Sequence, residues 1–203
     1  EHDLNTICSS GNCPNKGECW SAGTATFMIL GEKCTRNCRF CYVDSLMPDP
    51  VDWSEPSRVA YTIKKLSLKH AVLTSVARDD LEDQGAAFWA KTIKIVKSVN
   101  PGITMEVLIP DFNNNRDLLD LLIAEAPDII SHNIETVERI SPKIRSMATY
   151  ETSLKVLEYI SDSGISAKSG FMLGLGEKKE EVLDTMKDLL QTGVKVLTIG
   201  QYL

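Results

Sequence analysis

Three cysteines lie within eight residues of this sequence, spaced so that their sulfurs can gather around one inorganic centre. They are Cys34, Cys38 and Cys41. Three thiolates can hold a cubane of four irons and leave one iron without a protein sulfur, so that this iron can bind a small ligand. The spacing therefore predicts a 4Fe–4S cluster with one open iron.

Other interpretations of this spacing compete with the cluster. Positions i, i+4 and i+7 share one helical face, so the cysteines could be small buried hydrophobes, although the polar residues between them extend no apolar stripe. Zinc also accepts thiolates, but it favours a filled tetrahedron and no histidine lies nearby. Disulfides are possible as well, because six cysteines allow fifteen pairings.

A second group of cysteines, Cys8, Cys13 and Cys19, lies near the start of the chain. Glycine and proline residues between them disfavour a regular element, so we expect a shaped loop. Two triplets, each one ligand short of four, predict two separate clusters. The triplets could also pool into one mixed site, and a disulfide-linked or zinc-binding module is the alternative for this group. All six cysteines precede residue 42, which favours metal ligation in a reducing compartment.

The composition is that of an ordinary globular protein. The 203 residues, 43% hydrophobic and 25% charged, suffice for one domain or slightly more. A net charge of −6 without a basic stripe argues against a nucleic-acid partner. No run approaches eighteen apolar residues, so we expect no membrane partner. Because no signal peptide opens the sequence, we expect a cytoplasmic protein, or one of an organelle matrix if a leader was removed.

The elements that must position the cysteines alternate between extended and helical patterns. An apolar strand over 25–31, closed by glycine, leads into the three-cysteine segment. Further strands are expected over 71–76, 103–109, 128–134, 166–173 and 194–199, and helices over 55–68, 85–99, 116–125, 150–163 and 178–191. Six βα units predict an α/β fold, a partial (βα)6 barrel of parallel strands with helices outside, over residues 25–203. Residues 1–24 form an N-terminal cysteine-rich extension. An open doubly wound sheet is the alternative.

The expected strands carry polar residues in or after their carboxyl-terminal parts, where parallel folds carry their chemistry. These residues include Thr74, Ser75, Arg78, Asp79, Asp80, Glu106, Asp111, His132, Asn133, Glu135, Lys168 and Thr198. The glycine-rich stretch 170–177 lacks the dinucleotide fingerprint and suits a backbone that approaches a flat ligand closely.

These motifs resemble a known family. The Cys-x3-Cys-x2-Cys segment at 34–41 is similar to the cluster loop of the radical S-adenosylmethionine superfamily, and Gly-x-Met-x-Gly-x-x-Glu at 170–177 is similar to its adenine-side motif. The N-terminal Cys-x4-Cys-x5-Cys resembles, more narrowly, the lipoyl synthase family. Further similar stretches are 23–31, 73–80, 106–111, 132–136 and 198–203, so the resemblance runs from end to end.

The resemblance implies two 4Fe–4S clusters and S-adenosylmethionine as cofactors. Cys34, Cys38 and Cys41 would hold the cluster whose open iron binds S-adenosylmethionine, and the N-terminal triplet would hold an auxiliary cluster that supplies sulfur. In the family a serine from an Arg-Ser-Ser-Tyr stretch completes the auxiliary site, and these 203 residues do not contain that stretch. The residues expected to contact the cofactor are Thr74 and Ser75 at its methionine end, Asn133 and Glu135 at its ribose, Gly170, Met172 and Gly174 at its adenine, and Lys168.

The activity implied is that of a radical sulfurtransferase. It inserts two sulfur atoms at C6 and C8 of a protein-bound octanoyl chain through a 5′-deoxyadenosyl radical and consumes the auxiliary cluster. The partners would be an octanoylated lipoyl carrier domain and an electron donor such as a ferredoxin or flavodoxin, and no residue is assigned as a catalytic group. Two alternatives stay open: another auxiliary-cluster enzyme that inserts sulfur, similar to biotin synthase, and a non-catalytic zinc or cluster scaffold.

Overall fold

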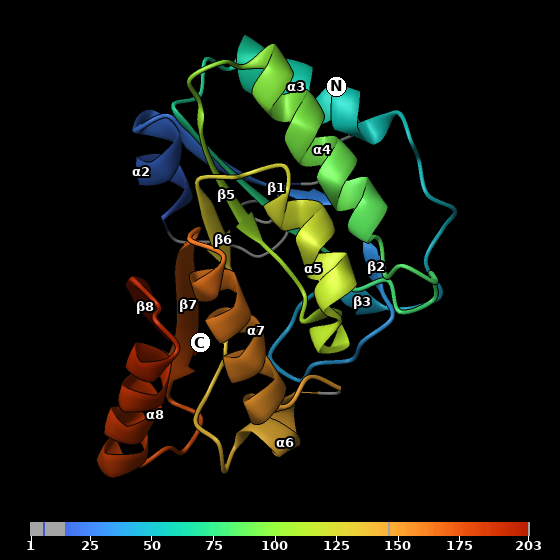
Figure 1. Ribbon diagram of the computed structural model, residues 1–203. Coiled ribbons are helices and arrows are strands. Elements are labelled where there is room, and N and C mark those ends of the chain that lie inside the picture. The colour runs from blue at the N-terminus through green and yellow to red at the C-terminus, as the bar shows by residue number, and fades with distance from the viewer. Residues whose placement is uncertain (1–5, 7–14, 146, 203) are drawn as a thin grey trace.

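A sheet of six parallel strands forms the body of the molecule. The computed structural model describes residues 6, 15–145 and 147–202, and its strands are β1 (Thr24–Ile29), β4 (His70–Ser75), β5 (Thr104–Leu108), β6 (Ile129–Ser131), β7 (Ser166–Leu173) and β8 (Val196–Gln201). Each pairs in parallel with the next along the chain, from β1 to β8 (Figure 1). A doubly wound sheet would reverse its order at a switch point, so the partial barrel is confirmed and the open sheet is wrong.

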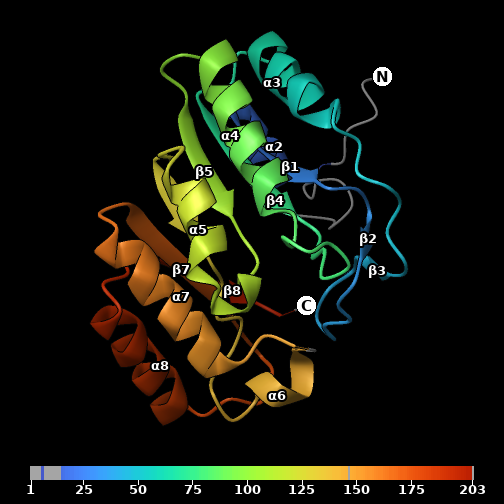
Figure 2. The ribbon, with the colours of Figure 1, turned by 45° about the vertical axis from the view of Figure 1, so that its right-hand side comes forward.

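Helices follow the strands and cover the outer face of this sheet (Figures 1 and 2). They are α3 (Glu55–Lys65), α4 (Ala86–Val99), α5 (Arg116–Ile123), α7 (Tyr150–Asp162) and α8 (Lys179–Gln191). Each lies within three residues of its predicted bounds. The largest difference is the early end of α3, where Leu66 caps the helix and Ser67 takes a positive φ of 50°.

The sequence patterns do not predict several short elements. These are α2 (Lys16–Ser21), α6 (Ser141–Ile144), the 3-10 turn η1 (Phe112–Asn114) and a small parallel sheet of β2 (Lys33–Cys34) and β3 (Asp44–Ser45). The prediction of a shaped loop around Cys19 is wrong, because α2 includes both Cys19 and Gly17; one glycine costs a helix only about 1 kcal/mol. Cys8 and Cys13 lie outside the described residues. No helix in the described part is long and apolar enough to cross a bilayer.

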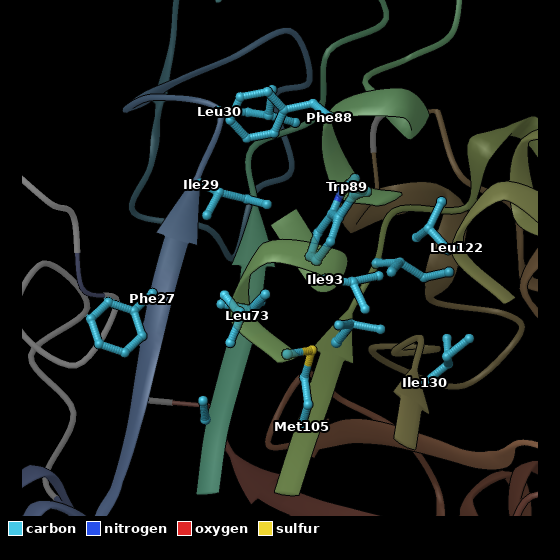
Figure 3. Packing of buried hydrophobic residues seen from close by; sticks show 14 of the residues in the cluster. Phe27, Ile29, Leu30, Leu73, Phe88, Trp89, Ile93, Met105, Leu122 and Ile130 are labelled. Carbon is cyan, nitrogen blue, oxygen red and sulfur yellow. The ribbon is translucent and has the colours of Figure 1, made fainter. Parts of the chain in front are cut away.

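The hydrophobic core lies between the sheet and the helices. Figure 3 shows strand residues packed with helix residues, and those that are no more than 2% exposed include Phe27, Ile29, Leu73, Met105, Ile130, Phe88, Trp89, Ile93 and Leu122. Because side chains alternate along a strand, the intervening residues point to the opposite face. Met28, Thr74 and Leu108 lie in register on that face. The sheet therefore presents its inner face to a potential ligand.

Candidate metal and cofactor site

A cavity of about 270 Å³ opens at the carboxyl ends of β1, β4, β5 and β6. The predicted site residues that line it are Cys34, Cys38, Cys41, Thr74, Ser75, Asn133 and Glu135. The tertiary structure thus brings together three cysteines from one loop, two polar residues at the end of β4 and two that follow β6. Lys168, Gly170, Met172 and Gly174 lie outside this lining.

The cysteine loop, residues 32–43, is held to the barrel at both ends. The Thr35 hydroxyl donates to the Asp79 carboxylate (2.6 Å), and its backbone N–H donates to the Ala77 carbonyl (3.1 Å). On the other side the Arg39 N–H donates to the Ile144 carbonyl at the end of α6 (2.8 Å). Phe40 packs on the small apolar cluster that includes Ile144. The loop therefore spans the rim from β4 to α6.

The sulfurs fit a cluster better than the competing interpretations. Cys34, Cys38 and Cys41 are thiols and the segment is not helical, so the disulfide and helical-face alternatives are wrong for them. The Cys34 sulfur accepts N–H bonds from Ala77 (3.3 Å) and Arg36 (3.4 Å), which stabilise a thiolate. Within the described residues no three Cys, His, Asp or Glu side chains are placed to share one metal ion. A cubane does not require this, because each thiolate binds a different iron.

Electrostatics around the loop also suit a bound cation. Cys41 is the most exposed of the three cysteines, yet loss of bulk water around its sulfur raises the pKa of the thiol, and the charges of Cys34 and Cys38 add to the rise. Bringing three thiolates together is costly without a metal, and iron would remove that cost.

His132 is a buried neutral residue at the floor of the cavity. Its Nδ1–H donates to the Ile109 carbonyl (2.9 Å), and its Nε2 accepts from the Ser153 hydroxyl (2.8 Å). A carbonyl can only accept, so the single proton of the neutral imidazole lies on Nδ1 and Nε2 must accept; the Ser153 oxygen also accepts from Arg145 (2.8 Å). Burial, and then the charge of Arg145, lower the pKa of His132 to about 4. The imidazole therefore fixes the backbone around the cavity and stays uncharged near neutral pH.

Glu135 and Asn133 face the cavity from the segment that follows β6. β6 stops at Ser131, although a strand was predicted to 134, and Glu135 takes a positive φ of 68°. The backbone of Glu135 still bonds to β7, at Gly170 O (3.1 Å) and Met172 N (2.9 Å). Burial raises the pKa of Glu135 to about 7, against the opposing charge of Arg145 and a hydrogen bond from Asn133.

Arg145 is a cavity residue that the sequence analysis missed. Its side chain is 8% exposed and donates to neutral oxygens, namely Ile134 O, Thr149 O and the Ser153 hydroxyl. Burial lowers its pKa, and the charge of nearby Glu135 raises it. No local pattern could have revealed it, since it follows a single short helix and reaches the cavity only through folding.

The remaining predicted cofactor residues lie on β7 or directly after it and do not line the cavity. A Cβ on Gly170 would stand 2.9 Å from Asn133 Oδ1, so this glycine lets the two segments approach closely. Glu177 accepts the N–H groups of Gly174 (2.6 Å) and Leu175 (2.8 Å), which closes the loop after the strand. The Lys168 ammonium binds both carboxylate oxygens of Glu106 on β5, at 2.8 and 2.9 Å. Their contact with a cofactor stays a prediction.

The fold and the cysteine rim define a class of protein that comparison with known proteins confirms. Residues 28–189 match the model of the Radical SAM superfamily. Methylornithine synthase superposes with a TM-score of 0.70 at 14% identity, over 88% of this chain and 53% of that one. Streptococcus suis SuiB bound to S-adenosylmethionine superposes with a TM-score of 0.69 at 8% identity, over 93% and 44%. This chain thus spans about half the length of these structures, and their likeness shows the fold. The chain belongs to the radical SAM superfamily.

Sequence relatives narrow this class. The lipoyl synthase of Phocaeicola vulgatus is 61% identical over 202 residues, which are 100% of this chain and 71% of the relative. The lipoyl synthases of Treponema denticola and Porphyromonas gingivalis are 58% and 59% identical, with 70% and 72% of their lengths covered. The chain belongs to the lipoyl synthase family, so the resemblance is confirmed. Membership implies S-adenosylmethionine and a 4Fe–4S cluster as cofactors.

Proposed function

We propose that this chain inserts two sulfur atoms, at C6 and C8, into an octanoyl chain carried on a lipoyl carrier domain. One observation carries the proposal: Cys34, Cys38 and Cys41 face one cavity together with polar residues at the end of β4 and after β6. The three thiolates would hold a 4Fe–4S cluster that, when bound, supplies the electron for cleaving S-adenosylmethionine to a 5′-deoxyadenosyl radical. Relatives 56–61% identical over the whole chain support the assignment.

The remaining cavity residues bind the cofactor and exclude water. Thr74 and Ser75 are the proposed contacts of the methionine end, and Asn133 and Glu135 those of the ribose. Apolar side chains of Met28, Leu108, Ile109 and Val43 complete the walls. A carbon radical reacts with any hydrogen donor it meets, so these walls protect it until the octanoyl chain arrives. Lys168, Gly170 and Met172 on β7, with Gly174 directly after it, complete the proposed cofactor site.

A second cluster would supply the inserted sulfur. Cys8, Cys13 and Cys19 are its proposed ligands; Cys19 is a half-buried thiol on α2, which packs beside β1. The division of residues 1–24 and 25–203 into an auxiliary-cluster segment and a barrel follows from this assignment. We further propose a reducing compartment, the cytoplasm or an organelle matrix, and a ferredoxin or flavodoxin as electron donor.

Anaerobic incubation with S-adenosylmethionine, a reductant and an octanoyl-lysyl peptide tests the proposal. Mass spectrometry should find a peptide that has gained two sulfur atoms, and a Cys38→Ala variant should give none. Cleavage of S-adenosylmethionine without sulfur transfer would favour the biotin-synthase-like alternative. A colourless protein that contains zinc, in place of a brown one with thiolate-to-iron absorption, would favour the scaffold.

A further inference from the structure

A buried ion triad joins the cysteine loop to two strand ends. Arg36, between Cys34 and Cys38 in the sequence, donates to Asp79 through Nε (2.9 Å) and Nη2 (2.7 Å) and to Asp111 through Nη1 (2.7 Å). The side chains of Arg36 and Asp111 are 7% and 1% exposed. Asp79 lies after β4 and Asp111 after β5, so one guanidinium connects three segments.

The triad is rigid in a way that a surface ion pair is not. A two-pronged contact to one carboxylate fixes the plane of the guanidinium, and the third bond, to Asp111, fixes its rotation within that plane. Asp79 is also bonded by the Thr35 hydroxyl (2.6 Å), and Asp111 accepts the Asn113 N–H (3.3 Å). Each partner of Arg36 is therefore itself held in place.

Arg36 also lies beside two of the cysteines that are proposed to hold the cluster. The Arg36 backbone N–H donates to the Cys34 sulfur (3.4 Å), and the Arg36 side chain lines the cavity beside Cys34 and Cys38. A shift of the guanidinium would therefore move both the N–H donor and the direction of the neighbouring cysteines. Outer-shell partners of this kind typically tune metal affinity about 10- to 100-fold.

We propose that Arg36 is a positioning residue for the cluster: its bonds to Asp79 and Asp111 fix the separation of the Cys34 and Cys38 sulfurs and set the net charge beside them. This proposal rests on the proposed function, which assigns the cluster to this loop. Two carboxylates and one guanidinium give the triad a net charge of −1. Loss of the cation makes the surroundings more negative, and loss of either carboxylate makes them less negative.

The variants follow from this charge balance. Arg36→Met removes all three bonds and the cation, Arg36→Lys keeps the cation but loses the two-pronged geometry, and Asp79→Asn and Asp111→Asn each remove one negative charge. Arg58→Met is the matched control, because Arg58 forms an ion pair with Asp52 and is not among the residues that line the cavity of the three cysteines. All are made in a chain with Cys8, Cys13 and Cys19 changed to Ala, so that every bound iron reports on the cysteine loop. Circular dichroism confirms the fold of each.

Two measurements test the proposal. Competition with an iron chelator should show that Arg36→Met weakens cluster retention about 10- to 100-fold, that Arg36→Lys recovers part of the loss, and that Arg58→Met changes nothing. Redox titration followed by electron paramagnetic resonance should move the reduction potential down in Arg36→Met and up in Asp79→Asn and Asp111→Asn. A merely structural loosening would move all three variants in one direction.

The outcomes separate two failures. Equal iron retention in Arg36→Met and Arg58→Met, or potentials that shift in the same direction in the Arg36 and Asp variants, would overturn the role of Arg36 while the cluster assignment stands. If the background chain with intact Cys34, Cys38 and Cys41 binds no four-iron cluster, both the Arg36 proposal and the proposed function are overturned.

Discussion

The pKa values of two buried side chains, His132 and Glu135, are shifted in opposite directions. Removing either side chain should therefore change how the free energy of unfolding depends on pH. The pKa of His132 is lowered to about 4 by burial and by Arg145, and that of Glu135 is raised to about 7 by burial. An unfolded histidine titrates near 6.5, so folding resists its protonation as the pH falls. The stability that neutral His132 contributes is present above pH 6.5 and is lost as the pH falls towards 4.

Glu135 acts in the opposite direction. An unfolded glutamate ionises near 4.5, whereas the folded one keeps its proton until about pH 7. Its contribution is therefore present below pH 4.5 and is lost as the pH rises through 7. From pH 7 to pH 5 the linkage relation gives a loss of about 2 kcal/mol from His132 and a gain of about 2 kcal/mol from Glu135. The two nearly cancel in the native sequence.

Urea unfolding of the metal-free protein at pH 7 and pH 5 measures these contributions separately. Relative to the native sequence, His132→Gln should shift the stability difference between pH 5 and pH 7 by about 2 kcal/mol in favour of pH 5, and Glu135→Gln should shift it by a similar amount in favour of pH 7. Each protein is compared with itself, so the cost of the substitution cancels. Carboxyls whose pKa is lowered to about 2, such as Asp52 and Glu181, titrate below this window. The same pH difference in both variants and in the native sequence would refute the assignment of the two shifts.

Three further predictions concern packing and backbone. Gly170→Ala should weaken binding of S-adenosylmethionine about tenfold, because its Cβ would displace Asn133, whereas Gly200→Ala on β8, with open space around it, should leave the affinity unchanged in calorimetry. Leu73→Ala should lower the free energy of unfolding by about 2–5 kcal/mol; an equal loss in the control Leu190→Ala, which is 75% exposed, would contradict the packing argument. Lys168→Met should cost about 1–3 kcal/mol by leaving Glu106 without its cation, and adding Glu106→Gln should restore part of this; purely additive losses in thermal melts would show that the pair is not coupled.

The sequence by itself determined the features that depend only on residues close together in the chain. The spacing of the cysteines is a local feature, so the segment 34–41 was enough to predict a 4Fe–4S cluster. Hydrophobic periodicity is also local, and it predicted the six strands of the main sheet and the five long helices in their order. Parallel strands joined by helices then place every strand's carboxyl end on one rim, which is why Thr74, Ser75, Asn133 and Glu135 could be expected beside the cysteines.

The tertiary structure decided what depends on residues far apart in the chain. Arg36 binds Asp79 and Asp111, which are 43 and 75 residues away in the sequence, and Lys168 binds Glu106, which is 62 residues away. Arg145 lines the cavity, and Glu135 takes a left-handed backbone conformation while it pairs with β7. Such pairs form because burying a charge is costly unless an opposite charge or a hydrogen-bond partner lies beside it, and only the fold brings that partner close. No period or spacing in the sequence encodes which partner that will be.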